Sequence, residues 1–262
     1  MRTTLLALSL AATAALASCS KEEETTPTPV DGVTYSGVIR QTVLNNPVPG
    51  VSVCIAKPAG ACVLSDDYGQ FVLPNVPKNQ HVELTVAKTG FVSGIGLFDV
   101  KGVDRNDIDV SLADQALVTS IFSDAGITYD PTAGAAGLVL SDPTVQHGAS
   151  GYAATLTPAA GDGPYYTSLS AIDTTATETS DVGAVAFINL PDGDYTAEVT
   201  GPGTCTTDLV VANGPTSWPA VVRAGFLTYI VAECPDGAGG AGGAGGAGGG
   251  GGAGGGGGTG GV

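Results

Sequence analysis

Cys19, the first cysteine of the chain, follows a segment with the three parts of a secretory signal. Arg2 supplies a basic start, residues 5–17 are apolar or small, and small residues precede the cysteine. The apolar stretch is shorter than the roughly 20 residues that cross a bilayer as a helix. A thiol is a nucleophile that can be modified covalently once it is exposed at a cleavage site. The segment therefore predicts export, with residues 1–18 removed and Cys19 becoming the first mature residue.

Residues 16–19 read Leu-Ala-Ser-Cys, which resembles the lipobox of bacterial lipoproteins. The resemblance implies that the thiol of Cys19 is diacylated and that the new N-terminus is then acylated. The membrane would then be a partner, through the lipid on Cys19. Ser20 is not the aspartate that resembles an inner-membrane retention signal, so we expect the outer membrane of the cell envelope. The alternative is an ordinary signal followed by a chance cysteine.

The remaining cysteines form an even set, which an oxidising compartment favours as disulfides. They are Cys54, Cys62, Cys205 and Cys234. Four cysteines permit three pairings. We expect the local one, Cys54–Cys62 and Cys205–Cys234, because each bond then lies within one expected domain. A zinc site is the competing interpretation, but the cysteine spacings do not fit it and neither histidine is near them.

An acidic cluster at residues 104–109 is the one candidate for a metal site. Its oxygen-bearing side chains are Asp104, Asn106, Asp107 and Asp109, a set of ligands that Ca²⁺ can use. It is not an EF-hand loop, because it lacks the required glycine and the closing glutamate. A solvated acidic turn is the simpler interpretation, so we expect no bound metal.

Aromatic side chains provide weak candidates for ligand binding. Tyr165 and Tyr166 lie in an insertion at residues 160–177, and Trp218 lies in a later strand. Such rings can stack on a sugar or a peptide. The alternative is that they pack within the fold, with one tyrosine at a sandwich edge.

A catalytic set is not recognisable. His81 and His147 are the only histidines, and neither is part of a nucleophile-elbow or His-Glu-x-x-His motif. We expect His147 to lie in a loop and His81 to lie at the start of a strand, facing solvent. The chain is therefore predicted not to be an enzyme and to need no cofactor.

Charge and composition narrow the class of protein. The chain has nine Lys and Arg residues and 25 Asp and Glu residues, which gives a formal net charge of −16. This charge should repel nucleic acid and anionic lipid. Only 13% of residues are charged and 43% are hydrophobic, which is not the profile of a disordered acidic chain. The abundance of Thr, Ser, Val and Gly favours an extracellular β protein.

The first expected domain, residues 33–111, consists of short alternating runs between turn signals, a pattern typical of a β-sandwich. Several motifs here resemble the carboxypeptidase regulatory-like domain: residues 37–39, 49–53, 65–71 (Ser-Asp-Asp-Tyr-Gly-Gln-Phe), 73–77 (Leu-Pro-Asn-Val-Pro) and 89–91. The resemblance implies an Ig-like, transthyretin-like sandwich of the prealbumin type. The family's zinc ligands and catalytic acid belong to a separate domain, so no peptidase activity is implied.

The same block recurs later in the chain. Residues 151–156 match 50–53, and residues 179–195 match the stretch from 65 onward. We therefore expect a second sandwich at 127–235, so that the fold class is all-β with two tandem sandwiches. Residues 112–126 would be a connector, read as a short helix or as a final strand.

The flanking segments differ sharply in composition. Residues 19–32 are rich in charge, Thr and Pro and predict a flexible tether. Residues 236–262 are mostly Gly and predict a disordered tail, since they offer no side chains to bury.

The sequence thus predicts a lipid-anchored, non-catalytic cell-envelope protein that serves adhesion, scaffolding or the binding of a ligand or partner. The alternatives are a carbohydrate-binding module and an accessory subunit of an envelope enzyme or transporter. The fold alone does not choose among them, and the protein or glycan partner is not identified.

Overall fold

The computed structural model describes residues 31–144, 147–168, 171–207, 211–214 and 216–235. The expected signal segment (1–18), nearly all of the expected tether (19–32) and the expected tail (236–262) lie outside the described residues.

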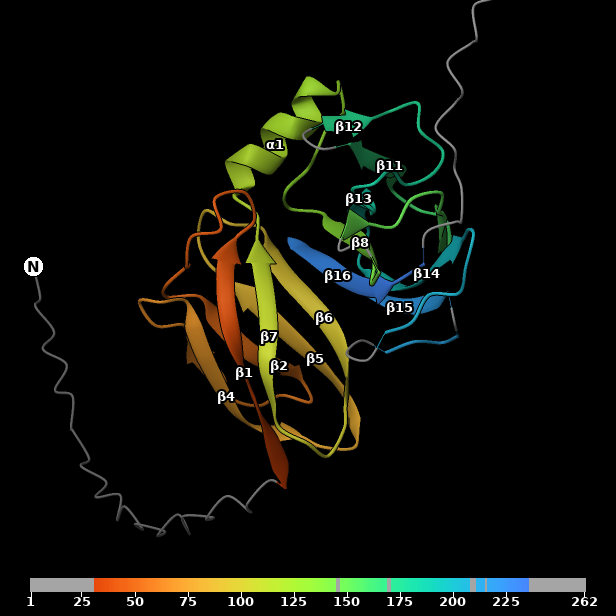
Figure 1. Cartoon of the computed structure of the whole chain (residues 1–262). Helices are drawn as coiled ribbons and strands as arrows, with labels where there is room; N and C mark the ends of the chain where they lie inside the picture. The colour runs from red at the N-terminus through yellow and green to blue at the C-terminus, as the bar shows by residue number, and fades with distance from the viewer. Residues whose placement is uncertain (1–30, 145–146, 169–170, 208–210, 215, 236–262) are drawn as a thin grey trace, which may run out of the picture. The chain divides into compact units, whose positions relative to one another are not determined.

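The described part of the chain is built of strands with one short helix (Figure 1). The elements up to the helix are β1 (Gly32–Gln41), β2 (Ser52–Lys57), β3 (Cys62–Leu64), β4 (Gln70–Pro77), β5 (Gln80–Ala87), β6 (Ser93–Val100), β7 (Arg105–Leu112) and α1 (Gln115–Asp124). Those after it are β8 (Gly134–Asp142), β9 (His147–Gly148), β10 (Ala153–Thr157), β11 (Asp162–Ser168), β12 (Ala171–Asp173), β13 (Ala184–Leu190), β14 (Gly193–Thr200), β15 (Ser217–Val222) and β16 (Phe226–Glu233).

The two halves share one topology, which confirms the expected pair of sandwiches. In the first half, β4-β1-β7 form one sheet and β2, β5 and β6 pair in the other. In the second half, β13-β8-β16 pair in the same way as β4-β1-β7, and β10-β14-β15 form the opposing sheet. In both halves the first strand pairs in parallel with the last: β1 with β7, and β8 with β16.

The repeat extends to individual hydrogen bonds. Ser65 Oγ donates to the carbonyl of Val48 over 2.8 Å and accepts from the amide of Val51 over 2.9 Å. Thr179 Oγ1 does the same in the second half, with Ala149 O at 2.7 Å and Tyr152 N at 3.1 Å. Both hydroxyls are buried and join the loop before the second strand to the body of the sandwich.

A glycine with positive φ stands at matching places in this repeat. Gly69 has φ +72°, and an added Cβ would lie 2.4 Å from the carbonyl oxygen of Ile39. Gly183 has φ +66°, with the carbonyl oxygen of Leu140 at 1.9 Å from such a Cβ. Both positions therefore require glycine.

The two sandwiches are joined edge to edge in one ten-stranded sheet. Strand β16 of the second half pairs in parallel with β6 of the first, from Phe226↔Ser93 to Thr228↔Ile95. Because side chains alternate along a strand, the two faces of this sheet serve different cores. One face packs against β4-β1-β7 through residues such as Val53 and Leu84.

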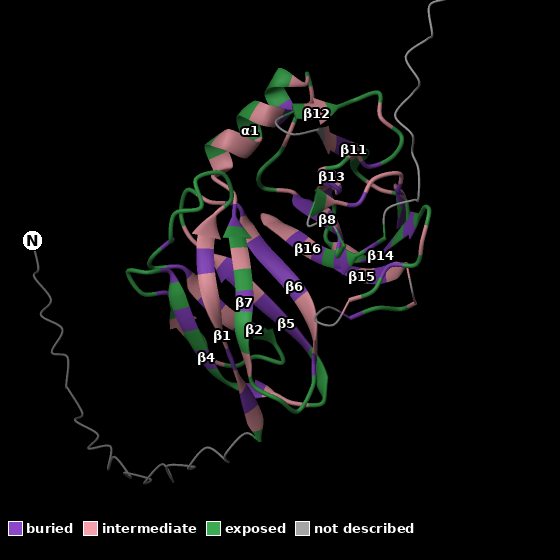
Figure 2. Cartoon of the chain, in the orientation of Figure 1, coloured by how far each residue is buried: buried purple, intermediate pink, exposed green. Residues whose placement is uncertain are grey.

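The opposite face packs against β10-β14-β15 through residues such as Leu138 and Ile230. Buried positions alternate with exposed ones along the strands of both halves (Figure 2). The two three-stranded sheets, β4-β1-β7 and β10-β14-β15, therefore cover opposite faces of the large sheet, one at each end.

The connector contains the expected short helix. Asp114 precedes α1 as its N-cap, and its carboxylate accepts from the amides of Ala116 and Leu117. Phe122 is the buried residue of the helix. It packs against Ala135 and Ile188, on the same face of the large sheet as β4-β1-β7 but beyond the part that those strands cover.

The insertion at 160–177 has regular structure. It contains β11 and β12, which pair with each other and extend the large sheet beyond β13. Strand pairing gives backbone partners to β11 and β12, so these residues widen one sheet of the second sandwich.

Candidate functional site

Cys19, the expected lipidation site, lies outside the described residues. The four other cysteines form the two local disulfides that the sequence predicts, Cys54–Cys62 and Cys205–Cys234. Cys54 and Cys62 face each other in register on the antiparallel pair β2 and β3. The first bond therefore fastens a hairpin at the edge of the large sheet.

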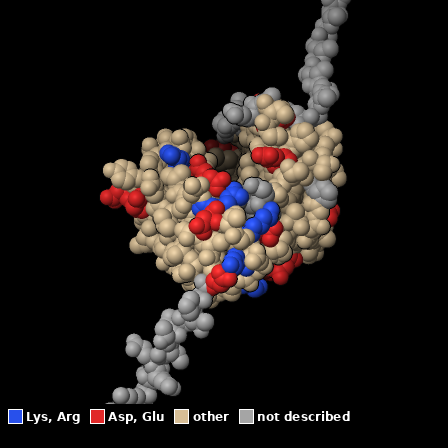
Figure 3. Space-filling model, turned by 60° about the horizontal axis from the view of Figure 1, so that its bottom comes forward, with Lys and Arg blue, Asp and Glu red and all other residues tan. Residues whose placement is uncertain are grey.

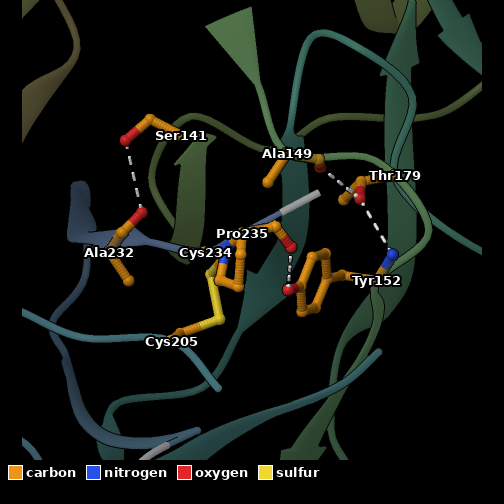
Figure 4. The surroundings of a disulfide bond; sticks show 8 residues. All are labelled: Ser141, Ala149, Tyr152, Thr179, Cys205, Ala232, Cys234 and Pro235. Carbon is orange, nitrogen blue, oxygen red and sulfur yellow. Dashed lines mark hydrogen bonds between the residues drawn. A yellow bond between two sulfur atoms is a disulfide. The ribbon is translucent and has the colours of Figure 1, made fainter. Parts of the chain in front are cut away.

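The second disulfide fastens the end of the last strand (Figure 4). Cys234 directly follows β16, and the adjoining residues Thr206 and Glu233 exchange two backbone hydrogen bonds of 2.8 Å. The hydroxyl of Tyr152 donates to the carbonyl of Pro235 over 2.6 Å. The chain is thus bound to the second sandwich up to the last described residue.

Two of the three aromatic residues proposed for ligand stacking are core residues, so that interpretation of them is wrong. Trp218 is 1% exposed and Tyr166 is 3% exposed. Tyr166 accepts a hydrogen bond from the amide of Ala154 within the second sandwich. Tyr165 is half-buried and its ring meets Phe122 of α1 edge-on, with ring centroids 6.0 Å apart. Alternation along their strands points Trp218 and Tyr166 into the core. Residue type alone does not reveal this direction.

The acidic cluster is not a turn, and the structure does not gather it into a metal site. Asn106, Asp107 and Asp109 lie on β7, and Asp104 precedes that strand. Arg105 binds both carboxylate oxygens of Asp107, over 2.9 and 3.0 Å, and this hydrogen bonding lowers the pKa of Asp107. Asp104 accepts from the amide of Thr34 over 2.7 Å. Over the described ranges, no group of three or more His, Cys, Asp or Glu side chains could hold a metal ion.

The two histidines lie far apart on the surface. His81 is exposed on β5, and its Nε2 lies 3.7 Å from a carboxylate oxygen of Asp99 on β6. His147 is exposed on β9, where its Nδ1 lies 2.7 Å from the carbonyl oxygen of Gly148.

Sequence reasoning missed a charged contact at the junction of the two sandwiches. Glu83 is buried on β5 of the first sandwich, 3.8 Å from Arg223 of the second and 3.7 Å from Lys57. Arg223 also lies 3.5 Å from Asp194. The sequence contains a signal for this contact, because Glu83 is the only charged residue in the alternating run at 82–87. A buried carboxylate is costly unless cations face it, so this contact favours one arrangement of the junction.

Basic and acidic side chains are interspersed on one face of the described part of the chain. Figure 3 shows Lys and Arg side chains next to Asp and Glu on a face that is otherwise mostly uncharged. This distribution agrees with the overall excess of acidic residues.

The comparisons with known proteins find distant likenesses only. No family model and no curated protein matches the chain. Among solved structures, the Bacillus anthracis TIE protein is 11% identical with a TM-score of 0.27, covering 77% of this chain and 34% of that one. This chain therefore spans about a third of the length of that protein.

Two pilins are similarly distant. The minor pilin GBS52 of Streptococcus agalactiae is 12% identical, with a TM-score of 0.27 and coverage of 78% of this chain and 96% of that one. BcpA, the major pilin of Bacillus cereus, is 10% identical, with a TM-score of 0.25 and coverage of 78% and 99%. Superpositions at this level carry no functional argument, and the fold assignment rests on the strand pairing described above.

The described residues contain no helix that is both long and apolar enough to span a bilayer.

Proposed function

We propose that this chain is a non-catalytic cell-envelope protein, anchored by lipid on Cys19, that bears tension between the membrane and a partner. It serves adhesion or scaffolding rather than chemistry. The lipobox-like residues 16–19 support the anchor, and Ser20 supports the outer membrane as its location. The motifs at 65–71 and 73–77 support descent from carboxypeptidase regulatory-like domains.

One observation carries the mechanical part of this proposal. In each sandwich the first and last strands are parallel neighbours. Tension along the chain enters the first sandwich at Gly32 and leaves at Leu112, which are the opposite ends of the β1–β7 pair. It enters the second at Gly134 and leaves at Glu233, the opposite ends of β8–β16.

This geometry resists force because it loads hydrogen bonds together. When parallel strands are pulled from opposite ends, they slide along each other, and all the bonds between them must yield at once. When antiparallel strands are pulled from the same end, the bonds open one after another. Forced unfolding is governed by the unfolding rate, so the shear arrangement favours a long lifetime under load.

The joint between the sandwiches adds a second path for the load. Strand β16 pairs with β6 as well as with β8, and Glu83 faces Arg223 across the junction. Part of the tension on the C-terminal strand therefore passes directly into the first sandwich.

Single-molecule pulling tests the mechanical proposal. With handles at residues 31 and 235, we expect a high rupture force. The matched control places handles at Gly32 and Lys78, because Gly32 pairs with Pro77 at one end of the antiparallel β1–β4 pair. That geometry should peel the strands at a clearly lower force. Equal forces in the two geometries would contradict a load-bearing role.

Fractionation tests the anchor separately. The natural chain should be recovered in the membrane pellet, because two or three acyl chains give stable anchoring. Cys19→Ala should release it into the soluble fraction, whereas Ser20→Ala should leave it in the pellet. A Cys19→Ala protein that stays in the pellet would show that another feature holds it there.

A further inference from the structure

The first sandwich has an open apolar cleft beside β7. Its smaller sheet, β4-β1-β7, ends at β7, while the facing sheet continues through β6 to β16 and β8. A cavity of about 280 Å³ lies at this step. Its lining is almost wholly apolar and includes Val53, Phe71, Val110, Val139, Tyr229 and Val231.

The floor of the cleft is a continuation of the core-facing surface of the first sandwich. Leu227 on β16 pairs with Gly94 on β6, and Val231 pairs with Val139 on β8. Because side chains alternate, Tyr229 and Val231 share the face that β4-β1-β7 covers farther along the sheet. Here nothing among the described strands covers it, and Val231 and Val139 are 49% and 39% exposed.

The wall of the cleft is a free strand edge. Of the described strands, only β1 pairs with β7. Backbone groups of alternate residues of β7 point away from β1, so its outer edge lines the cleft with the donors and acceptors of Asp109 and Ser111, which have no strand partner among the described strands. Such an edge is a template for a further strand.

Tyr229 provides a polar group inside the apolar floor. Its ring lies over Gly94, where an added Cβ would be 3.1 Å from a ring carbon. Burial raises the pKa of its hydroxyl to about 12, so it is a neutral hydrogen-bond donor at physiological pH. Within the described residues this hydroxyl has no hydrogen-bond partner, although it is not sealed from solvent.

We propose that the cleft binds an extended peptide segment of another protein, which pairs with the outer edge of β7 and inserts alternate apolar side chains into the cavity. The segment would extend β4-β1-β7 by one strand over the exposed floor. This mode of recognition takes affinity from main-chain hydrogen bonds and specificity from alternate side chains. The site depends on neither the lipid anchor nor the tension proposed above.

Charge selects among possible occupants. Asp109 is exposed on the outward face of β7, and the whole chain has a net charge of −16. Cross-strand pairs of opposite charge are favourable and like charges are not. The outward positions of the guest should therefore be Lys or Arg, and a second copy of this acidic chain is disfavoured.

A labelled peptide tests the inference directly. The probe is a fluorescein-labelled peptide of eight residues, the length of β7, that alternates Val and Lys. We expect it to bind the full-length chain in a polarisation assay. The matched control has the same side chains with alternate amides N-methylated, which removes strand pairing and should abolish binding. Equal binding of both peptides would overturn strand addition and leave charge attraction as the cause.

Variants locate the site. Val231→Glu places a charge on the exposed floor and should weaken peptide binding about tenfold or more while leaving the melting temperature nearly unchanged. Val103→Glu is the matched control, because Val103 is 60% exposed and lies outside the cleft lining. Equal losses in both variants would overturn the placement of the site.

Amide exchange identifies the mode of binding. The peptide should slow hydrogen exchange at the amides of Asp109 and Ser111, on the β7 edge. Binding without this protection would mean that the cleft takes an apolar side chain or small molecule only. Concentration-dependent dimers that Val231→Glu abolishes would show that a second copy is the occupant. Either result would overturn the proposal.

Discussion

At the residue scale, the repeat depends on one buried hydroxyl in each sandwich. Ser65 and Thr179 each join a carbonyl and an amide of the loop that leads to the second strand. The sequence places these residues at matching positions of the two motif blocks, but nothing in their types reveals what they bind.

We expect Ser65→Ala and Thr179→Val each to lower the free energy of unfolding by about 1–3 kcal/mol, because a buried amide and carbonyl lose their partner. The exchanges Ser65→Thr and Thr179→Ser retain the hydroxyl and should cost less. Urea unfolding of the four variants measures the difference. If the exchanges cost as much as the deletions, packing rather than hydrogen bonding is responsible.

Tyr229 should make stability fall at high pH. Burial raises its pKa to about 12 in the folded chain, against about 10 when unfolded. Between about pH 10 and pH 12 the unfolded state loses this proton and the folded state retains it, so the folded state loses relative stability as pH rises. Below about pH 10 the contribution is fully present.

Tyr229→Phe should flatten the decline of the melting temperature over that window. Tyr68→Phe removes an exposed phenol and serves as the control. Identical pH profiles for the two variants would contradict burial of the Tyr229 hydroxyl.

At the element scale, the two disulfides fasten chain loops of different length. Their sequence separations are 8 and 29 residues. On the chain-entropy model, they contribute about 2.5 and about 3.6 kcal/mol. The longer loop includes β15 and β16, so the second bond confines more of the unfolded chain.

The double variant Cys205→Ser/Cys234→Ser should therefore lose about 1 kcal/mol more unfolding free energy than Cys54→Ser/Cys62→Ser. Denaturant curves of the two variants, under non-reducing conditions, give this difference. A larger loss from the first pair would mean that the β2–β3 hairpin matters more to the fold than its loop length suggests.

At the scale of the whole molecule, the two sandwiches have separate cores but share a sheet. One apolar cluster lies within residues 33–112 and another within 136–234. The boundary near residue 127 stays a prediction, and it has a direct test.

A fragment of residues 127–235 should fold alone, because its apolar cluster and its disulfide are both internal. It should melt at a lower temperature than the full chain, since it loses the β6 partner of β16 and the Glu83 partner of Arg223. Calorimetry in an oxidising buffer checks both points. A disordered fragment would show that the junction is part of the folding unit.

Sequence alone determined the features that depend on neighbours along the chain. The short alternating runs and the short helix at Gln115–Asp124 are local, so residue types and spacing predict them. The Cys54–Cys62 bond follows from hairpin register for the same reason. The anchor role of Cys19 also rests on adjacent residues alone, and it stays a prediction.

Only the tertiary structure decided the pairing of segments far apart in the sequence. Strand β16 meets β6 across more than a hundred residues, and that contact buries Glu83 beside Arg223 and leaves Tyr229 and Val231 facing an open cleft. Packing within the second sandwich places Trp218 in the core, although the residue type suggests a binding site. Period-2 alternation specifies that a strand has two faces, but which sheet covers each face depends on non-local packing.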